Sequence, residues 1–148
     1  GQVADLFVSN WRGSKKLYPE TFNKKTGAMF GLTMVLGARI AKATPEQILL
    51  ARHYGRSLGF LFQVADDIAD LKANKSVSDS FREWAGPNPE GRLQEAMEEV
   101  IKLAREFPDS PVKMHLEVMP KYSVARLMAE VEDAQKPSRE HSNSPGQG

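Results

Sequence analysis

Three carboxylates stand within the most apolar stretch of this 148-residue sequence, which reads Phe62-Gln63-Val64-Ala65-Asp66-Asp67-Ile68-Ala69-Asp70. In a helix, Asp66 and Asp70 would lie one turn apart on the same face, where like charges repel. No lysine or arginine between positions 57 and 71 offsets that repulsion. A divalent cation would, because carboxylate oxygens bind hard cations. The spacing predicts a metal site at Asp66, Asp67 and Asp70, with Mg²⁺ expected and Mn²⁺ as a substitute.

The residues before the carboxylates indicate the kind of substrate. Magnesium is usually held by one or two carboxylates together with substrate phosphates. The apolar run Phe60-Leu61-Phe62 precedes the aspartates and would place them at the mouth of an apolar wall. This arrangement suits a ligand with a diphosphate head and a hydrocarbon tail. The alternative is that the aspartates are an exposed helix end without a ligand.

A long helix must position these carboxylates. Thr44 is a suitable N-cap, Pro45 suits the first helical position and Gln47 completes a capping box. The apolar residues that follow surround the whole circumference, which is typical of a central, buried helix. We expect this helix to end near Leu71–Asn74.

The rest of the chain is also predicted to be helical, because no sustained period-2 alternation occurs. A helix is expected from Pro19 or Thr21 to Ala41, followed later by a turn-rich stretch over Lys72–Pro89. Further helices are expected after the Asn88 cap and as two short pieces, Val112–Val118 and Tyr122–Ala134. The fold class is an all-α helical bundle over residues 1–135, with a disordered tail over residues 136–148.

Composition excludes several function classes. Twenty Lys and Arg against nineteen Asp and Glu leave a net charge of +1, which argues against a nucleic-acid-binding protein. The absence of cysteine excludes disulfides, cysteine-ligated zinc and thiol catalysis. No apolar run reaches the length needed to span a bilayer. A cytoplasmic protein is expected.

Four segments in order resemble one known family, the trans-isoprenyl diphosphate synthases of the polyprenyl synthetase family. Gly59 to Asp70 resembles the family's second aspartate-rich motif, and Gly55, Leu58 and Gly59 fit its Gly-x-x-Leu-Gly lead-in. Two further segments resemble its Gly-Gln-x-x-Asp-Leu helix and its Lys-Thr-Gly-x-Leu-Phe segment: Gly1-Gln2 with Asp5-Leu6, and Lys25-Thr26-Gly27-Ala28-Met29-Phe30. The resemblance covers about residues 1–80.

The resemblance implies a fold, a reaction and residue roles. The fold would be half of an isoprenoid synthase bundle around a central apolar cavity. The reaction would be the Mg²⁺-dependent condensation of an allylic diphosphate with isopentenyl diphosphate. Lys25 would hold the diphosphate, and Lys75, which resembles the lysine that follows the motif, would also contact it. Thr26 and Gln63 would line the point where the allylic cation develops.

The chain also departs from the family. The first aspartate-rich motif is absent, and the loop after Asp70 is short, which weakens the Lys75 assignment. A complementary chain bearing the first motif is therefore the expected partner, in a dimer or hetero-oligomer. Without that partner, the apolar face of the helix after Thr44 would be exposed to water.

Two other functions remain open. The chain could be a non-catalytic regulatory subunit of a prenyl diphosphate synthase. It could instead be a class I terpene cyclase, which adds a downstream metal motif of Asn, Ser and Glu. Asn74 and Ser78 have that spacing, but Arg82 occupies the position of the glutamate.

Overall fold

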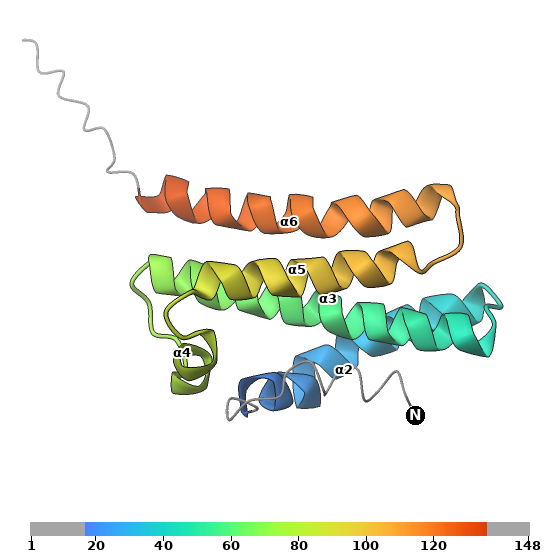
Figure 1. Ribbon diagram of the computed structural model, residues 1–148, viewed down its shortest axis with the longest axis horizontal. Helices are drawn as coiled ribbons and strands as arrows, with labels where there is room; N and C mark the ends of the chain where they lie inside the picture. The colour runs from blue at the N-terminus through green and yellow to red at the C-terminus, as the bar shows by residue number, and fades with distance from the viewer. Residues whose placement is uncertain (1–16, 136–148) are drawn as a thin grey trace, which may run out of the picture.

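A computed structural model describes residues 17–135, which form five helices (Figure 1). The Gly1-Gln2 and Asp5-Leu6 segment and the predicted tail over residues 136–148 lie outside the described residues. The helices are α2 (Leu17–Ile40), α3 (Pro45–Lys72), α4 (Asp79–Ala85), α5 (Pro89–Arg105) and α6 (Pro111–Gln135). The described part contains no strand, which confirms the all-α prediction.

Helix α3 is the centre of the bundle. It contacts α2, α5 and α6, and Figure 1 shows α3, α5 and α6 running side by side along the long axis. Its start follows the predicted capping box: the Thr44 side chain accepts a hydrogen bond from the Gln47 N–H, and the Gln47 side chain accepts one from the Thr44 N–H. The helix ends at Lys72, within the predicted region.

The expectation that α3 would expose an apolar face is wrong. Its apolar side chains are buried by α2, α5 and α6, and among its large apolar residues only Leu49 is strongly exposed. The exposed apolar side chains lie instead mainly on α2 and α6. The core fills the space between helices with Tyr54, Leu61, Val64, Ile68, Phe81 and Val100.

Two glycines allow α2 to approach α3 closely. A Cβ atom at Gly55 would lie 2.6 Å from the carbonyl oxygen of Phe30. A Cβ atom at Gly59 would lie 2.9 Å from the Phe30 ring. Only glycine leaves room for this contact, so the Gly-x-x-x-Gly spacing sets the distance between the two helices.

The short helix α4 was not predicted, because its segment reads as a polar, turn-rich loop. Ser78 caps it by accepting a hydrogen bond from the Phe81 N–H at 3.2 Å. Phe81 and Trp84 are buried, and the Trp84 ring stacks on Tyr18 of α2 at 5.0 Å. Burial of these two aromatic side chains stabilises the helix. Gly86 ends it with a φ of 61°.

The prediction of two short helices near the C-terminus is also wrong, because α6 is continuous through Pro120. Proline lacks the N–H that would bond the carbonyl of residue i−4, here Leu116. The Tyr54 hydroxyl of α3 donates a hydrogen bond to that carbonyl at 2.9 Å. Pro120 itself is fully buried. A tertiary hydrogen bond thus replaces the one that proline removes from the helix.

None of the described helices is long and apolar enough to cross a membrane.

Candidate metal-binding site

The three aspartates lie in the last two turns of α3. Asp66 is exposed, whereas Asp67 and Asp70 are partly buried. Although Asp66 is exposed, the surrounding protein removes part of the water around its carboxylate and raises its pKa, and the nearby Asp70 and Asp67 carboxylates raise it further. The repulsion expected from the sequence is therefore present in the folded chain, and it favours binding of a cation.

Asp67 has a different environment from its neighbours. Its Oδ2 accepts hydrogen bonds from the Tyr18 hydroxyl of α2 and from the Gln63 amide, the latter at 3.1 Å. Burial, and then the hydrogen bond and charge of Asp67, raise the pKa of Tyr18, which keeps the hydroxyl protonated as a donor. Asp67 thus joins α2 to α3. Sequence reasoning missed Tyr18, because no local pattern links it to a residue 49 positions away.

Asp70 is paired with Lys75. The Lys75 ammonium lies 3.0 Å from Asp70 Oδ1, and the Lys75 N–H donates to the Asp70 carbonyl at 2.9 Å. A turn with Asn74 at a φ of 54° brings the lysine back toward α3. The structure therefore places Lys75 beside the carboxylates. Its side chain is 68% exposed, so it is accessible to a ligand.

The carboxylates fit a divalent cation in part. Among residues 17–135, no three His, Cys, Asp or Glu side chains are arranged to hold a metal ion. Asp66 and Asp70 nevertheless share one accessible face, which suits magnesium held by two carboxylates and substrate phosphates. Asp67 is engaged by Tyr18 and Gln63. The predicted three-aspartate metal site is therefore not formed among the described residues, which offer two accessible carboxylates on one side of α3.

The predicted substrate-contacting residues are divided between two helices. Gln63, on α3, points its amide toward Asp67. Thr26 is half-buried on α2, one turn before Phe30, whose ring packs against Phe62 of α3 at 6.0 Å. Lys25 precedes Thr26 on α2, and its side chain lies outside the described part. Phe30 and Phe62 form an apolar contact between α2 and α3.

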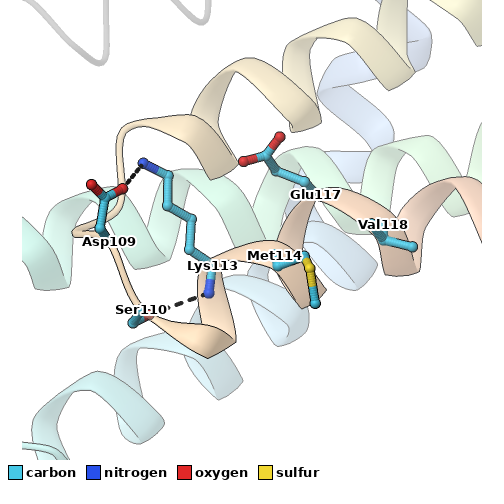
Figure 2. Close-up of a pocket in the computed structure, with 6 residues that line it drawn as sticks. All are labelled: Asp109, Ser110, Lys113, Met114, Glu117 and Val118. Carbon is cyan, nitrogen blue, oxygen red and sulfur yellow. Dashed lines mark hydrogen bonds and ion pairs between the residues drawn. The ribbon is translucent and has the colours of Figure 1, made fainter.

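A separate surface depression of about 400 Å³ lies where α5 turns into α6 (Figure 2). Its lining includes Lys113, which pairs with Asp109 at 3.0 Å, and Glu117, which pairs with Arg105 at 3.3 Å. No residue that the sequence assigned to the site lines this depression. The depression therefore lies apart from the residues of the predicted chemistry.

Comparison with known proteins places the chain in a family. The polyprenyl synthetase family profile matches residues 1–80. The chain is 31% identical over 88 residues to the short chain isoprenyl diphosphate synthase of Methanocaldococcus jannaschii, covering 56% of this chain and 27% of that protein. It is 32% identical over 75 residues to the farnesyl diphosphate synthase of Bacillus subtilis, covering 51% and 25%.

A third relative is named as a subunit. The chain is 40% identical over 57 residues to the heterodimeric geranylgeranyl pyrophosphate synthase small subunit of Arabidopsis thaliana, covering 37% and 18%. The aligned regions thus span about a quarter or less of the length of these relatives. No solved structure matches the chain. The family match takes in the aspartates of α3 and the Lys-Thr segment of α2, and the chain therefore belongs to the polyprenyl synthetase family.

Proposed function

We propose that this chain is the C-terminal catalytic part of a prenyltransferase that condenses an allylic diphosphate with isopentenyl diphosphate. The observation that carries the proposal is the accessible pair of carboxylates, Asp66 and Asp70, at the end of a buried apolar helix. The activity would also require a complementary region bearing the first aspartate-rich motif, which the given residues do not contain.

The chain's own residues would bind and orient the allylic diphosphate. Asp66 and Asp70 would hold Mg²⁺, which when bound acts as a Lewis acid toward the departing diphosphate. Lys25 and Lys75 would contact the diphosphate oxygens and stabilise their charge. Lys75 would leave its ion pair with Asp70 to do so, a small cost because exposed pairs contribute little.

The polar oxygens of Thr26 and Gln63 would face the developing allylic cation. Gln63 donates its amide N–H to Asp67, which leaves its carbonyl oxygen free to orient toward positive charge. Phe30 and Phe62 would exclude water from the allylic cation. Water that reached the cation would otherwise quench it. The hydrogen bonds from Tyr18 and Gln63 would keep Asp67 from rotating.

A regulatory subunit is the second candidate. It is favoured by the similarity to the protein named as a heterodimeric small subunit and by the engagement of Asp67 with Tyr18 and Gln63. In that case the chain would modulate a complete synthase, and its aspartates would be dispensable.

Reconstitution with the complementary region tests the proposal. The full chain is mixed with the part of the Bacillus subtilis farnesyl diphosphate synthase outside its matched segment, with Mg²⁺, an allylic diphosphate and isopentenyl diphosphate. We expect elongated product only when both chains are present and no chelator is added. Asp66→Ala and Asp70→Ala should each lower kcat/KM by roughly 10²-fold or more.

A carboxylate far from the site provides the control. Asp109→Ala removes an aspartate of the connection between α5 and α6 and should leave the activity unchanged. A stable complex that is inactive with the unsubstituted chain would contradict the catalytic proposal. Activity that survives Asp66→Ala would favour the regulatory role.

A further inference from the structure

Tyr18, near the start of α2, has its ring fixed by aromatic neighbours from other helices. Only 6% of this residue is exposed. Its ring stacks on Trp84 at 5.0 Å, lies edge-on to Phe81 at 5.3 Å and lies 5.9 Å from Phe60, measured between ring centres. The Arg92 guanidinium of α5 lies in turn 5.4 Å from the centre of the Trp84 ring. Contacts with α3 and α4 thus fix the place of the Tyr18 hydroxyl.

That hydroxyl and the Gln63 amide meet at one oxygen atom. Asp67 Oδ2 accepts a hydrogen bond from each of them, the one from Gln63 Nε2 at 3.1 Å. Gln63 and Asp67 are four residues apart on α3 and are therefore neighbours on one face of the helix, whereas Tyr18 approaches from α2. Donors from two helices hold the Asp67 carboxylate in one orientation, as supporting hydrogen bonds do around a binding site.

The orientation of the Gln63 amide follows from its acceptor. A side-chain amide carries its NH₂ group and its carbonyl oxygen on opposite sides of one carbon atom. Because the NH₂ group donates to Asp67, the carbonyl oxygen faces away from that carboxylate. If the carboxylate could rotate, the amide would lose the partner that distinguishes its two ends. The hydroxyl of Tyr18 therefore acts on Gln63 through Asp67.

We propose that Tyr18 is a positioning residue that, through Asp67, holds the Gln63 carbonyl oxygen toward the reacting carbon of the substrate. This inference rests on the proposed function, in which that oxygen faces the developing allylic cation. A dipole that is already oriented stabilises a developing charge without reorganising during the reaction. The inference also gives Asp67 a role separate from that of Asp66 and Asp70, because it orients a neighbouring side chain rather than binding Mg²⁺.

The contact can be tested on the full chain without substrate or Mg²⁺. In isotopically labelled protein, the hydrogens of the Gln63 side-chain amide give NMR signals that are identified by their loss in Gln63→Ala. Tyr18→Phe removes only the hydroxyl group. We expect the Gln63 signals to shift in this variant and the amide hydrogens to exchange with water about tenfold faster, because the acceptor is held less firmly. Unchanged signals and exchange would overturn the proposal.

Tyr54→Phe is the matched control. Tyr54 is also a buried tyrosine whose hydroxyl joins two helices, because it donates to the Leu116 carbonyl of α6 at 2.9 Å. It precedes Asp67 by thirteen residues on α3, or about 20 Å along the helix. We expect both tyrosine variants to lose stability, but only Tyr18→Phe to change the Gln63 amide. Equal effects of the two variants on that amide would indicate a general loss of packing and would also overturn the proposal.

Kinetics of the reconstituted enzyme test the consequence for the reaction. Tyr18→Phe should lower kcat about tenfold and leave the KM for the allylic diphosphate unchanged, because the oriented dipole acts in the transition state. In a Gln63→Ala background, Tyr18→Phe should lower kcat no further, since the side chain that it positions is absent. A tyrosine with a merely structural role would lower kcat in both backgrounds, which would contradict the positioning role.

The proposed function can fail separately from this inference. A reconstituted complex that is inactive, although the Gln63 amide responds to Tyr18→Phe as expected, would contradict the proposed function and support the positioning of Gln63 by Tyr18. Condensation activity that is abolished by Asp66→Ala but unaffected by Tyr18→Phe would support the proposed function and overturn this inference.

Discussion

Asp66 illustrates a residue whose charge opposes stability and favours binding. Asp66 and Asp70 are four residues apart in α3, so they lie on the same side of the helix, and the charge of Asp70 raises the pKa of Asp66. Like charges at this spacing destabilise a helix by about 0.2–0.5 kcal/mol. Such a cost is typical of binding sites, where stability and function compete.

We therefore expect Asp66→Asn to raise the free energy of unfolding by about 0.2–0.5 kcal/mol in the presence of chelator. Adding Mg²⁺ should stabilise the unsubstituted chain and have little effect on Asp66→Asn, because the variant lacks one carboxylate ligand. Urea unfolding with and without Mg²⁺ measures both effects. Equal stabilisation of the two proteins by Mg²⁺ would place the ion elsewhere.

The environment of His53 predicts that the folded chain becomes less stable in mild acid. Burial lowers its pKa, the Arg56 and Arg52 charges lower it further, and Glu106 acts in the opposite direction. The unfolded chain therefore binds a proton more readily than the folded chain, and stability falls as the pH drops below the ordinary histidine pKa of 6.5. Unfolding experiments between pH 7 and 5 should show this loss.

The His53→Gln variant should have a flatter pH dependence over that range. His115→Gln, which changes an exposed histidine of α6, should keep the dependence of the unsubstituted chain. If the His53→Gln profile matches that of the unsubstituted chain, a group other than His53 controls the acid response.

At the scale of the elements, the contact between α2 and α3 depends on the absence of side chains. Gly55→Ala would place a Cβ atom 2.6 Å from the Phe30 carbonyl oxygen, so the helices would have to separate. We expect a loss of about 1–3 kcal/mol in the free energy of unfolding. Gly37→Ala is the matched control, because nothing lies within 4 Å of its Cβ position.

Gly37→Ala should stabilise the chain by up to about 1 kcal/mol, because alanine has the higher helix propensity. Thermal unfolding of both variants gives the comparison. Opposite signs for two Gly→Ala changes would establish that packing, rather than helix propensity, requires glycine at position 55. A loss of similar size in both would contradict this explanation.

The hydrogen bond between Tyr54 and α6 predicts a coupling between two residues far apart in the sequence. Tyr54→Phe would leave the Leu116 carbonyl without its donor and cost about 1–3 kcal/mol. In a Pro120→Ala background the cost should be smaller, since residue 120 then supplies an N–H to the same carbonyl. A double-mutant cycle on the free energy of unfolding measures this coupling.

Tyr122→Phe provides the control for that cycle, because this tyrosine is 66% exposed. Its hydroxyl should contribute little in either background. Additive effects of Tyr54→Phe and Pro120→Ala would show that the hydroxyl does not replace the hydrogen bond lost at proline.

At the scale of the whole molecule, the apolar side chains that remain exposed gather on two helices. Met29, Leu32, Leu36 and Ile40 follow one face of α2, whereas α6 carries the exposed residues Val112, Met114, Val118, Met119 and Tyr122. The helix α3, which contacts both, has its own apolar sides buried.

Local patterns in the sequence were sufficient for the caps and for most of the helices. The capping side chains each accept a hydrogen bond from a backbone N–H three residues away, so their roles follow from spacing alone. These side chains are Thr44, Gln47 and Asn88. The pair formed by Asp66 and Asp70 follows equally from the helical repeat. The helix α4 did not follow, because its stability comes from burial of Phe81 and Trp84 against distant residues.

The same distinction between local patterns and distant contacts applies to the candidate site. The sequence alone determined the all-α class, the family resemblance and the carboxylates of α3, since each depends on residue type and short spacing. Only the tertiary structure decided that Asp67 is held by Tyr18, that α6 continues through Pro120 and that the exposed apolar side chains lie mainly on α2 and α6. These three outcomes depend on contacts between separate helices, and the helical repeat carries no information about which helices meet.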